Sequence, residues 1–292
     1  MVIVALYLIM MDRTEVDVLT VMLQQEQKTY QIIPQNVESR SRLGTRSIHS
    51  INYICCDLSQ HEERASCRYN MVDWCYRMIN FCNLNRETVA IAMNYVDRFV
   101  VTEQGQSYLT SDTLYQLVAV TALYTAIKVH EIQSIDLQSL VNVSKGTYSL
   151  KQIERVEREI VNALQWRMNP PTAMSFVRSL IELIPHHYKL SAKVRESILK
   201  LSRVQAEYAV FDQELANSKM STVGYCSLIN AMRTMIRDQV MLKNIKHTLA
   251  QELKIQLNNS ELEQAQPKLY LLLSNKNNIG SGANQLNLIS PQ

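Results

Sequence analysis

Four charged residues stand on segments whose remaining pattern predicts buried apolar faces: Arg68, Asp97, Lys128 and Glu157. An isolated charge is costly to bury, so a charge on a core-facing helix indicates an internal ion pair or a surface reserved for another molecule. We assign Arg68 and Asp97 to an internal pair, because a guanidinium and a carboxylate form two parallel hydrogen bonds. We assign Lys128 and Glu157 to a surface that binds a partner.

Two helices must position the first pair. Apolar residues at helical spacing predict one buried face over 71–82 and another over 89–100. Arg68 opens the first of these helices and Asp97 lies late on the second. An antiparallel hairpin would bring the two side chains together, and removing one partner would then leave the other charge unpaired.

Two later helices carry the second pair. Residues 110–128 are apolar on nearly every side, which predicts the central helix of a domain, and Lys128 ends it. Ser149 and Gln152 form a capping-box signature before another helix, which carries Glu157 midway. Lys128 and Glu157 lie on different helices, so the i, i+4 rule cannot pair them.

The rest of the chain also favours helix, because it holds only 6 glycines and 6 prolines. A short helix is predicted over 132–143, and the proline pair at 170–171 ends the first group of helices. Five further segments have a helical pattern, although Pro267 interrupts the last: 172–184, 192–211, 221–237, 244–257 and 261–273.

These segments predict an all-α protein made of two tandem five-helix bundles with a short N-terminal helix. The expected organisation is an apolar leader over 1–16, the N-terminal helix over 17–31, a linker over 32–62, the first bundle over 63–170, the second over 171–273 and a disordered tail over 274–292. The leader is too short to cross a bilayer, which needs about 20 residues, and no basic residue precedes it.

Composition and motifs argue against a nucleic-acid-binding protein, a metalloprotein and an enzyme. The net charge of +3 is too small to indicate a nucleic-acid surface by itself. The 6 cysteines form no CxxC pair, so we expect reduced thiols, no metal and no cofactor. His61 and Glu62 begin an HExxH-like run, but Ala65 stands where the second histidine is needed. No glycine-rich phosphate loop or nucleophile elbow occurs, so we expect no catalytic activity.

Taken in order, the motifs resemble the cyclin box: RYNMVDW from Arg68, YVDRF around Asp97, LVAVTALYTAIKVHE from Leu117 through Lys128, and IERVE ending at Glu157. The resemblance covers about 100 residues closely and continues more weakly through the second bundle, as in two-lobed cyclins. All five residue types that typify the box occur here in order: Arg68, Asp97, Leu117, Lys128 and Glu157. The upstream run VLTVMLQQEQK is similar to the N-terminal helix of D-type cyclins.

The resemblance implies a non-catalytic subunit that binds and activates a cyclin-dependent protein kinase as a heterodimer. Lys128 and Glu157 would grip the kinase backbone beside its regulatory helix, whereas Arg68, Asp97 and Leu117 would be structural. It also implies a role in cell-cycle progression, with G1 or G1/S favoured, and a place in the nucleus and cytoplasm. Kinase substrates or inhibitors are possible further partners, and neither nucleic acid nor a membrane is expected.

Many cyclins also dock substrates in a groove on the first helix of the box. The corresponding residues here are Cys67, Asn70, Met71 and Trp74. The tryptophan is kept, but a polar amide replaces a branched apolar residue and a cysteine replaces a methionine. Because a polar amide weakens an apolar anchor site, docking of RxL peptides is not expected, and Trp74 is equally interpreted as a core residue.

Two alternatives share the fold. A transcriptional cyclin, which partners a polymerase-directed kinase, is separated poorly from a cell-cycle cyclin by this sequence, and the helix over 17–31 is the one feature used to discriminate them. A cyclin-fold transcription initiation factor would carry a zinc ribbon and a strongly basic DNA face, and this chain has neither a CxxC pair nor a marked basic run.

Overall fold

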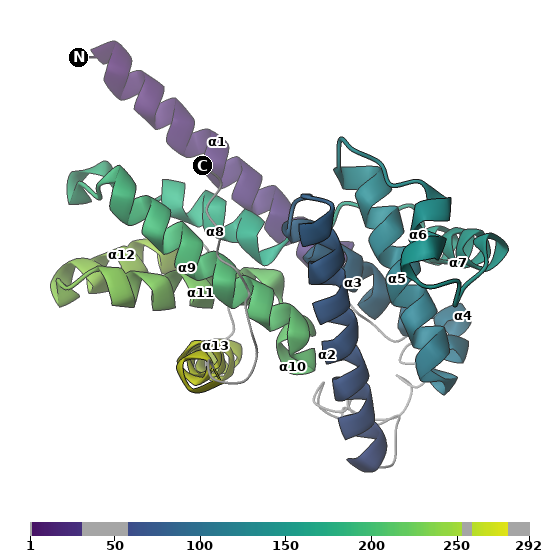
Figure 1. Cartoon of the computed structure of the whole chain (residues 1–292). Coiled ribbons are helices and arrows are strands. Elements are labelled where there is room, and N and C mark those ends of the chain that lie inside the picture. Colours follow the sequence, from purple (N-terminus) through teal and green to yellow (C-terminus); the bar gives the residue numbers. More distant parts are fainter. Residues whose placement is uncertain (1, 31–57, 253–258, 280–292) are drawn as a thin grey trace, which may run out of the picture. The chain divides into compact units, whose positions relative to one another are not determined.

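The computed structural model describes residues 2–30, 58–252 and 259–279, and every regular element in those ranges is a helix (Figure 1). The chain divides into two compact units. The first comprises Asp17–Thr172 with Val210–Met220, and the second comprises Met1–Val16, Ala173–Ala209 and Ser221–Gln292. The segment Val210–Met220 thus belongs to the first unit although it follows the proline pair in sequence.

The first unit contains the five helices predicted for the first bundle. They are α2 (Leu58–Phe81), α3 (Glu87–Val100), α5 (Asp112–His130), α6 (Leu137–Val143) and α7 (Leu150–Ala163). Two short turns that the sequence did not predict, α4 (Glu103–Gln106) and the 3-10 helix η3 (Ser107–Thr110), connect α3 to α5. A third short helix, α10 (Gln213–Ala216), is capped by Asp212, whose carboxylate accepts hydrogen bonds from the backbone N–H groups of Glu214 and Leu215.

Helix α5 is the centre of this unit, as its all-round apolar composition predicts. Every residue from Leu117 to Ile127 is buried, and the helix packs against α2, α3 and α7. Helix α7 contributes a single apolar face of Ile153, Val156 and Ile160, and its start is fixed by the capping box of Ser149 and Gln152. These two helices carry Lys128 and Glu157, so their packing sets the geometry of that pair.

The N-terminal helix is longer than predicted. Helix α1 runs over Val2–Lys28, so it begins within the segment interpreted as a leader rather than at residue 17. No proline or glycine occurs between Val2 and Lys28, so nothing in the sequence stops the helix from extending through the apolar run. Within the first unit, Leu19 and Leu23 are buried side chains of this helix.

Two predicted boundaries also shift. Helix α2 begins at Leu58, inside the predicted linker, of which residues 32–57 lie outside the described part of the chain. Helix α13 (Asn259–Ile279) extends six residues into the predicted tail, because no helix breaker occurs after Pro267 until Gly280. Residues 280–292 of that tail lie outside the described residues.

The second unit holds the other five predicted helices, with somewhat different ends. They are α8 (Ala173–Glu182), α9 (Ala192–Phe211, to Ala209 in this unit), α11 (Met220–Met235, from Ser221 in this unit), α12 (Gln239–Glu252) and α13; the 3-10 turn η4 (His186–Tyr188) lies between α8 and α9. Pro267 lies inside α13 rather than ending it. Pro267 and Glu263, the residue four positions earlier, are both exposed, so water can replace the backbone hydrogen bond that proline cannot make.

Buried amides join three helices of the second unit. The Asn230 side chain on α11 donates to Oε1 of Gln205 on α9 at 2.9 Å, and Gln205 donates to the carbonyl of Ser227 at 3.0 Å. Asn230 also exchanges hydrogen bonds with Gln266 on α13. The amides are paired with one another, so the buried polar groups specify one packing of α9, α11 and α13.

Two further observations concern the described residues only. None of their helices is long and apolar enough to cross a membrane. They also contain no group of three His, Cys, Asp or Glu side chains that could hold a metal ion. The described cysteines are free thiols, at 67, 75, 82 and 226, whereas Cys55 and Cys56 lie outside the described part.

Candidate functional site

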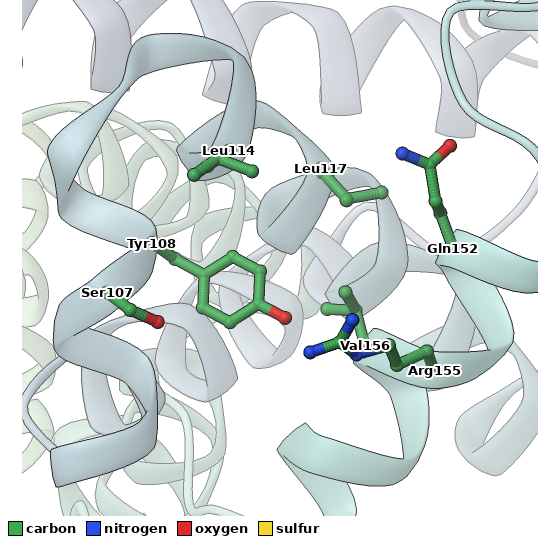
Figure 2. Close-up of a pocket in the computed structure, with 7 residues that line it drawn as sticks. All are labelled: Ser107, Tyr108, Leu114, Leu117, Gln152, Arg155 and Val156. Carbon is green, nitrogen blue, oxygen red and sulfur yellow. The ribbon is translucent and has the colours of Figure 1, made fainter.

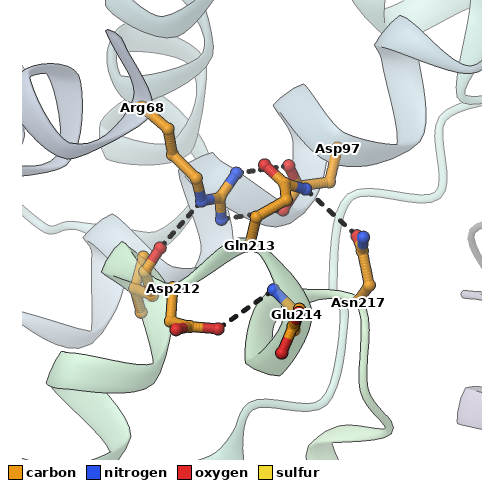
Figure 3. A network of polar contacts seen from close by, with 7 residues as sticks. Arg68, Asp97, Asp212, Gln213, Glu214 and Asn217 are labelled. Atoms are coloured by element: carbon orange, nitrogen blue, oxygen red, sulfur yellow. Dashed lines mark hydrogen bonds and ion pairs between the residues drawn. The ribbon is translucent and has the colours of Figure 1, made fainter. Parts of the chain in front are cut away.

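The Arg68–Asp97 pair is formed as predicted, between α2 and α3 (Figure 3). Nη1 of Arg68 donates to Oδ1 of Asp97 at 2.6 Å, and Nη2 donates to Oδ2 at 3.1 Å. Arg68 is 1% exposed and Asp97 is 6% exposed, so the bidentate bond lies inside the unit. Burial acts to lower the pKa of the Arg68 guanidinium, but the charge of Asp97 outweighs burial and the pKa is raised.

Two further groups that the sequence did not reveal complete this site. Nε of Arg68 donates to the backbone carbonyl of Val210 at 3.0 Å, across a separation of 142 residues. The phenol of Tyr115 on α5 also interacts with Arg68, and burial raises the pKa of that phenol. Arg68 therefore ties α2 to α3, to α5 and to the segment that begins at Val210, which makes it structural.

Lys128 and Glu157 contact each other across α5 and α7. Nζ of Lys128 donates to Oε1 of Glu157 at 2.9 Å, the Thr125 hydroxyl approaches the same carboxylate at 3.4 Å, and the ammonium lies 5.0 Å from the centre of the Tyr124 ring. The Lys128 side chain is 43% exposed and the Glu157 side chain 18%. Burial acts to lower the pKa of Lys128, but the hydrogen bond and the charge of Glu157 outweigh it and the pKa is raised. The pair is thus ordered and still open to solvent.

Three apolar side chains are exposed at the end of α5 and just after α7, the two helices that carry the pair, and the sequence analysis did not select them. Val129 is 51% exposed and Ile132 is fully exposed at the end of α5, and Trp166 is 76% exposed just after α7. The end of α5 contacts the segment that follows α7, because Nε2 of His130 lies 2.8 Å from the carbonyl oxygen of Met168. An apolar residue next to Lys128 and a tryptophan after the last turn of α7 are signals that the sequence did contain.

Trp166 is also held in an unusual backbone conformation. Its φ is +59°, and that of Gln165 is +52°, in the left-handed region that non-glycine residues rarely adopt. The backbone N–H of Trp166 donates to the carbonyl of Val161 at 3.0 Å, which closes the end of α7. The turn therefore fixes the position of an indole that is turned to solvent.

The N-terminal helix is connected to the same region through Arg98. This arginine is 6% exposed, donates from Nη1 to the carbonyl of Arg167 at 2.9 Å, and lies 4.9 Å from the centre of the Tyr30 ring. Burial lowers the pKa of Arg98 to about 10. The end of the N-terminal segment thus packs on α3 through a cation–π contact.

Leu117, the apolar member of the predicted set, is 4% exposed on α5. It lines a cavity of about 260 Å³ together with Tyr108 of η3 and Val156 of α7 (Figure 2). Arg155 at the edge of this cavity already binds Glu159, 2.8 Å from Nε to Oε1, and Glu159 accepts a second hydrogen bond from Tyr108 at 2.6 Å. Leu117 therefore belongs mainly to the core.

The residues predicted for the docking groove fall in two places. Asn70 is exposed, Met71 is 6% exposed and Trp74 is partly buried, and these three line a groove of about 310 Å³ beside α2. Cys67 is 7% exposed and is not among the lining residues. It lies instead near Asp112 and Gln116, and burial raises the pKa of its thiol. Trp74 is therefore more than a core residue, because part of it faces the groove.

Comparisons with known proteins show which proteins this chain is similar to. The family model described as "Cyclin, N-terminal domain" matches residues 33–169. Cyclin-D3-2 of Arabidopsis thaliana is 38% identical over 119 residues, which cover 40% of this chain and 31% of that protein. The G2/mitotic-specific cyclin-B1 of Caenorhabditis elegans is 23% identical over 209 residues, or 70% of this chain and 56% of that protein. The G1/S-specific cyclin-E1 of Rattus norvegicus is 29% identical over 120 residues, or 41% and 28%.

Among solved structures, a viral cyclin from herpesvirus saimiri matches with a TM-score of 0.53 and 12% sequence identity, over 72% of this chain and 88% of that chain. The two proteins therefore share the all-α cyclin fold. The first relatives given above are matched over only 31% and 56% of their own lengths.

Proposed function

Because the chain belongs to the cyclin family, we propose that it is the regulatory, non-catalytic subunit of a cyclin-dependent protein kinase. The observation that carries this proposal is the ordered and partly exposed Lys128–Glu157 pair that joins α5 to α7. Val129, which follows Lys128 in the sequence, and Trp166, just after α7, are also exposed. Exposed aromatic side chains and charge pairs are groups in which binding energy concentrates at protein interfaces. The kinase would act in the nucleus and cytoplasm.

The pair can bind a partner without first coming apart. A lysine ammonium has three donors and a carboxylate has about four acceptor positions, and one of each is used in the 2.9 Å bond between Nζ and Oε1. Lys128 therefore keeps donors for backbone carbonyls of the kinase, and Glu157 keeps acceptors for backbone N–H groups. The existing ion pair fixes both side chains in advance, which lowers the entropy lost when the complex forms.

The proposed mechanism is a shift in the population of kinase conformations. A protein kinase needs an ion pair between a lysine of its β-sheet and a glutamate of its regulatory helix before it transfers phosphate. The rigid face made by α5 and α7 would bind the kinase only when that helix is turned inward. Moving a kinase from about 1% to 99% active requires a difference in affinity of about 5.5 kcal/mol between its two states.

We further propose a role at G1 or G1/S, as the run VLTVMLQQEQK suggested. In the described part of that run, Leu19 and Leu23 are buried whereas Val18 and Val21 are about half exposed. An apolar strip therefore remains on the outside of α1 within the first unit. This strip would add to the kinase-binding face, because an exposed apolar face on a helix is available for a partner.

Affinity capture with identification of the bound proteins tests the class of partner. The full-length chain, tagged at its C-terminus and expressed in cells of its own organism, should retain a serine/threonine protein kinase in near-stoichiometric amount. The comparison variant is the same chain with Trp166→Asp, which replaces the exposed indole after α7 by a charge and should reduce the recovered kinase strongly. Recovery of other partners at stoichiometric level with no kinase would contradict the proposal.

A further inference from the structure

The turn after α7 contains two successive residues with a left-handed backbone. Gln165 has φ +52° and Trp166 has φ +59°. This conformation costs free energy for any residue with a side chain, and it persists only where the surrounding structure holds it. Many helices end instead on a glycine, which adopts the same conformation at little cost. A tryptophan in this place therefore indicates that its indole has a use.

Backbone groups close the first half of this turn onto α7. The N–H of Trp166 donates to the carbonyl of Val161 at 3.0 Å, and the N–H of Arg167 donates to the carbonyl of Leu164 at 3.0 Å. These bonds satisfy carbonyls that a helix end otherwise leaves without a partner. Both donors belong to the backbone, so almost any residue could supply them.

Side chains of α3 and α5 hold the second half of the turn. Nη1 of Arg98 on α3 donates to the carbonyl of Arg167 at 2.9 Å. The hydroxyl of Tyr95, also on α3, donates to the carbonyl of Met168. Nε2 of His130, the last residue of α5, lies 2.8 Å from the same carbonyl oxygen. The two carbonyls that follow the indole are thus bound by three particular side chains rather than by backbone groups.

These contacts assign the protons around the Met168 carbonyl. A carbonyl oxygen has two lone pairs and no proton, so both of its partners must donate. Tyr95 is buried, and burial raises the pKa of its phenol, so the hydroxyl keeps the proton that it donates. We therefore assign a hydrogen to Nε2 of His130, which also lies 3.0 Å from the Tyr95 oxygen. Loss of either donor would leave one lone pair of the carbonyl open.

We infer that Tyr95, Arg98 and His130 are positioning residues for the turn after α7. They hold the indole of Trp166 at one place on the surface, where it is 76% exposed. Tyr95 and Arg98 are themselves buried, so they act through the turn rather than by touching a partner. An indole that is held in advance loses less entropy when a partner binds, which raises the affinity.

This inference deepens the proposed function, because the partner that the indole would meet is the proposed kinase. The state of the turn, however, is a property of the chain alone. A measurement on the free chain can therefore test the positioning role separately from kinase binding.

The fluorescence of Trp166 provides that measurement on the full-length chain. The sequence holds two tryptophans, so Trp74→Phe leaves Trp166 as the one reporter. In that background, Tyr95→Phe removes one hydroxyl and keeps the ring, and Tyr108→Phe makes the same change at another buried tyrosine, which bonds to Glu159 instead. Time-resolved anisotropy should show an amplitude of nanosecond indole motion at least about twofold larger for Tyr95→Phe and unchanged for Tyr108→Phe.

A second variant, His130→Phe, removes the other donor to Met168 and should increase the indole motion in the same way. It is the safer of the two for folding, because His130 is only partly buried. Far-UV circular dichroism verifies the helix content of each variant. If the anisotropy decays of Tyr95→Phe and His130→Phe equal that of the Trp74→Phe reference, these residues do not hold the indole and the inference is wrong.

Kinase affinity then separates a positioning role from a purely structural one. Tyr95→Phe and Tyr108→Phe each remove a hydrogen bond of a buried tyrosine, so both can lower thermal stability. The affinity for the captured kinase should fall at least about fivefold for Tyr95→Phe and His130→Phe and stay within about twofold for Tyr108→Phe. Equal losses in all three would assign the effect to stability and overturn the inference. If the unaltered chain binds no kinase, the proposed function fails, and the anisotropy still decides whether these side chains hold the turn.

Discussion

Replacing Arg68 with alanine should lower the free energy of unfolding by about 3–5 kcal/mol, because it leaves the buried carboxylate of Asp97 without its partner. It also removes the donor to the Val210 carbonyl and the contact with Tyr115. For a unit of this size, a loss of that order lowers the midpoint of thermal unfolding by roughly 10 °C. Differential scanning calorimetry of the full-length chain measures the change.

A matched arginine on the same helix provides the control. Arg77 is 71% exposed in its side chain and pairs with Asp73, so Arg77→Ala should change the free energy of unfolding by no more than about 0.5 kcal/mol. The double variant Arg68→Ala with Asp97→Ala should be less destabilised than the sum of the two single variants, since it leaves no unpaired charge. An unchanged unfolding midpoint for Arg68→Ala would refute the structural role of the pair.

The second large effect concerns binding. Changing both Lys128 and Glu157 to alanine should weaken binding of the captured kinase at least about 100-fold, since each charge-assisted bond at an interface contributes a few kcal/mol when it is truncated. The fold should survive, because Lys128 is 43% exposed and the double change leaves no charge of the pair behind. Isothermal titration calorimetry gives the affinity, and far-UV circular dichroism gives the helix content.

The control for this experiment changes another lysine and another glutamate, both on α7. Lys151→Ala with Glu154→Ala removes one lysine and one glutamate from exposed positions of α7 and should leave kinase affinity within about twofold. If the Lys128 and Glu157 variant binds the kinase as strongly as the unaltered chain, the kinase face lies elsewhere.

Periodicity predicted most helices of this fold because their apolar positions repeat over several turns. The sequence predicted a helix over 89–100 from the spacing of Val89, Met93 and Val96. The structure has α3 there and buries all three side chains. Helix ends were less predictable. The start of α1 at Val2 was missed because an unbroken apolar run has no period that separates a helix from a leader, and the shift at the end of α13 has a similar cause.

The contacts of the candidate site also differ in how well the sequence predicts them. Contacts between adjacent helices could be predicted, whereas contacts between segments far apart in the chain could not. The Arg68–Asp97 bond was predictable because two adjacent helices bring the residues together, whereas the Val210 carbonyl comes from 142 residues away and any residue has a carbonyl. The direct contact between Lys128 and Glu157 required the packing of α5 on α7, which spacing along the chain does not give. The exposed apolar residues at the end of α5 and after α7 were not predicted, because exposure is not visible in a sequence.

The central claim is that this chain activates a kinase, and the rate of phosphoryl transfer tests it most directly. The captured kinase, purified without the chain, would be assayed on a peptide substrate while the full-length chain is added to saturation. A shift from about 1% to 99% active molecules predicts a rise in rate of about 100-fold, and the Lys128 and Glu157 variant should fail to produce it. A complex that forms with no increase in rate would contradict the account.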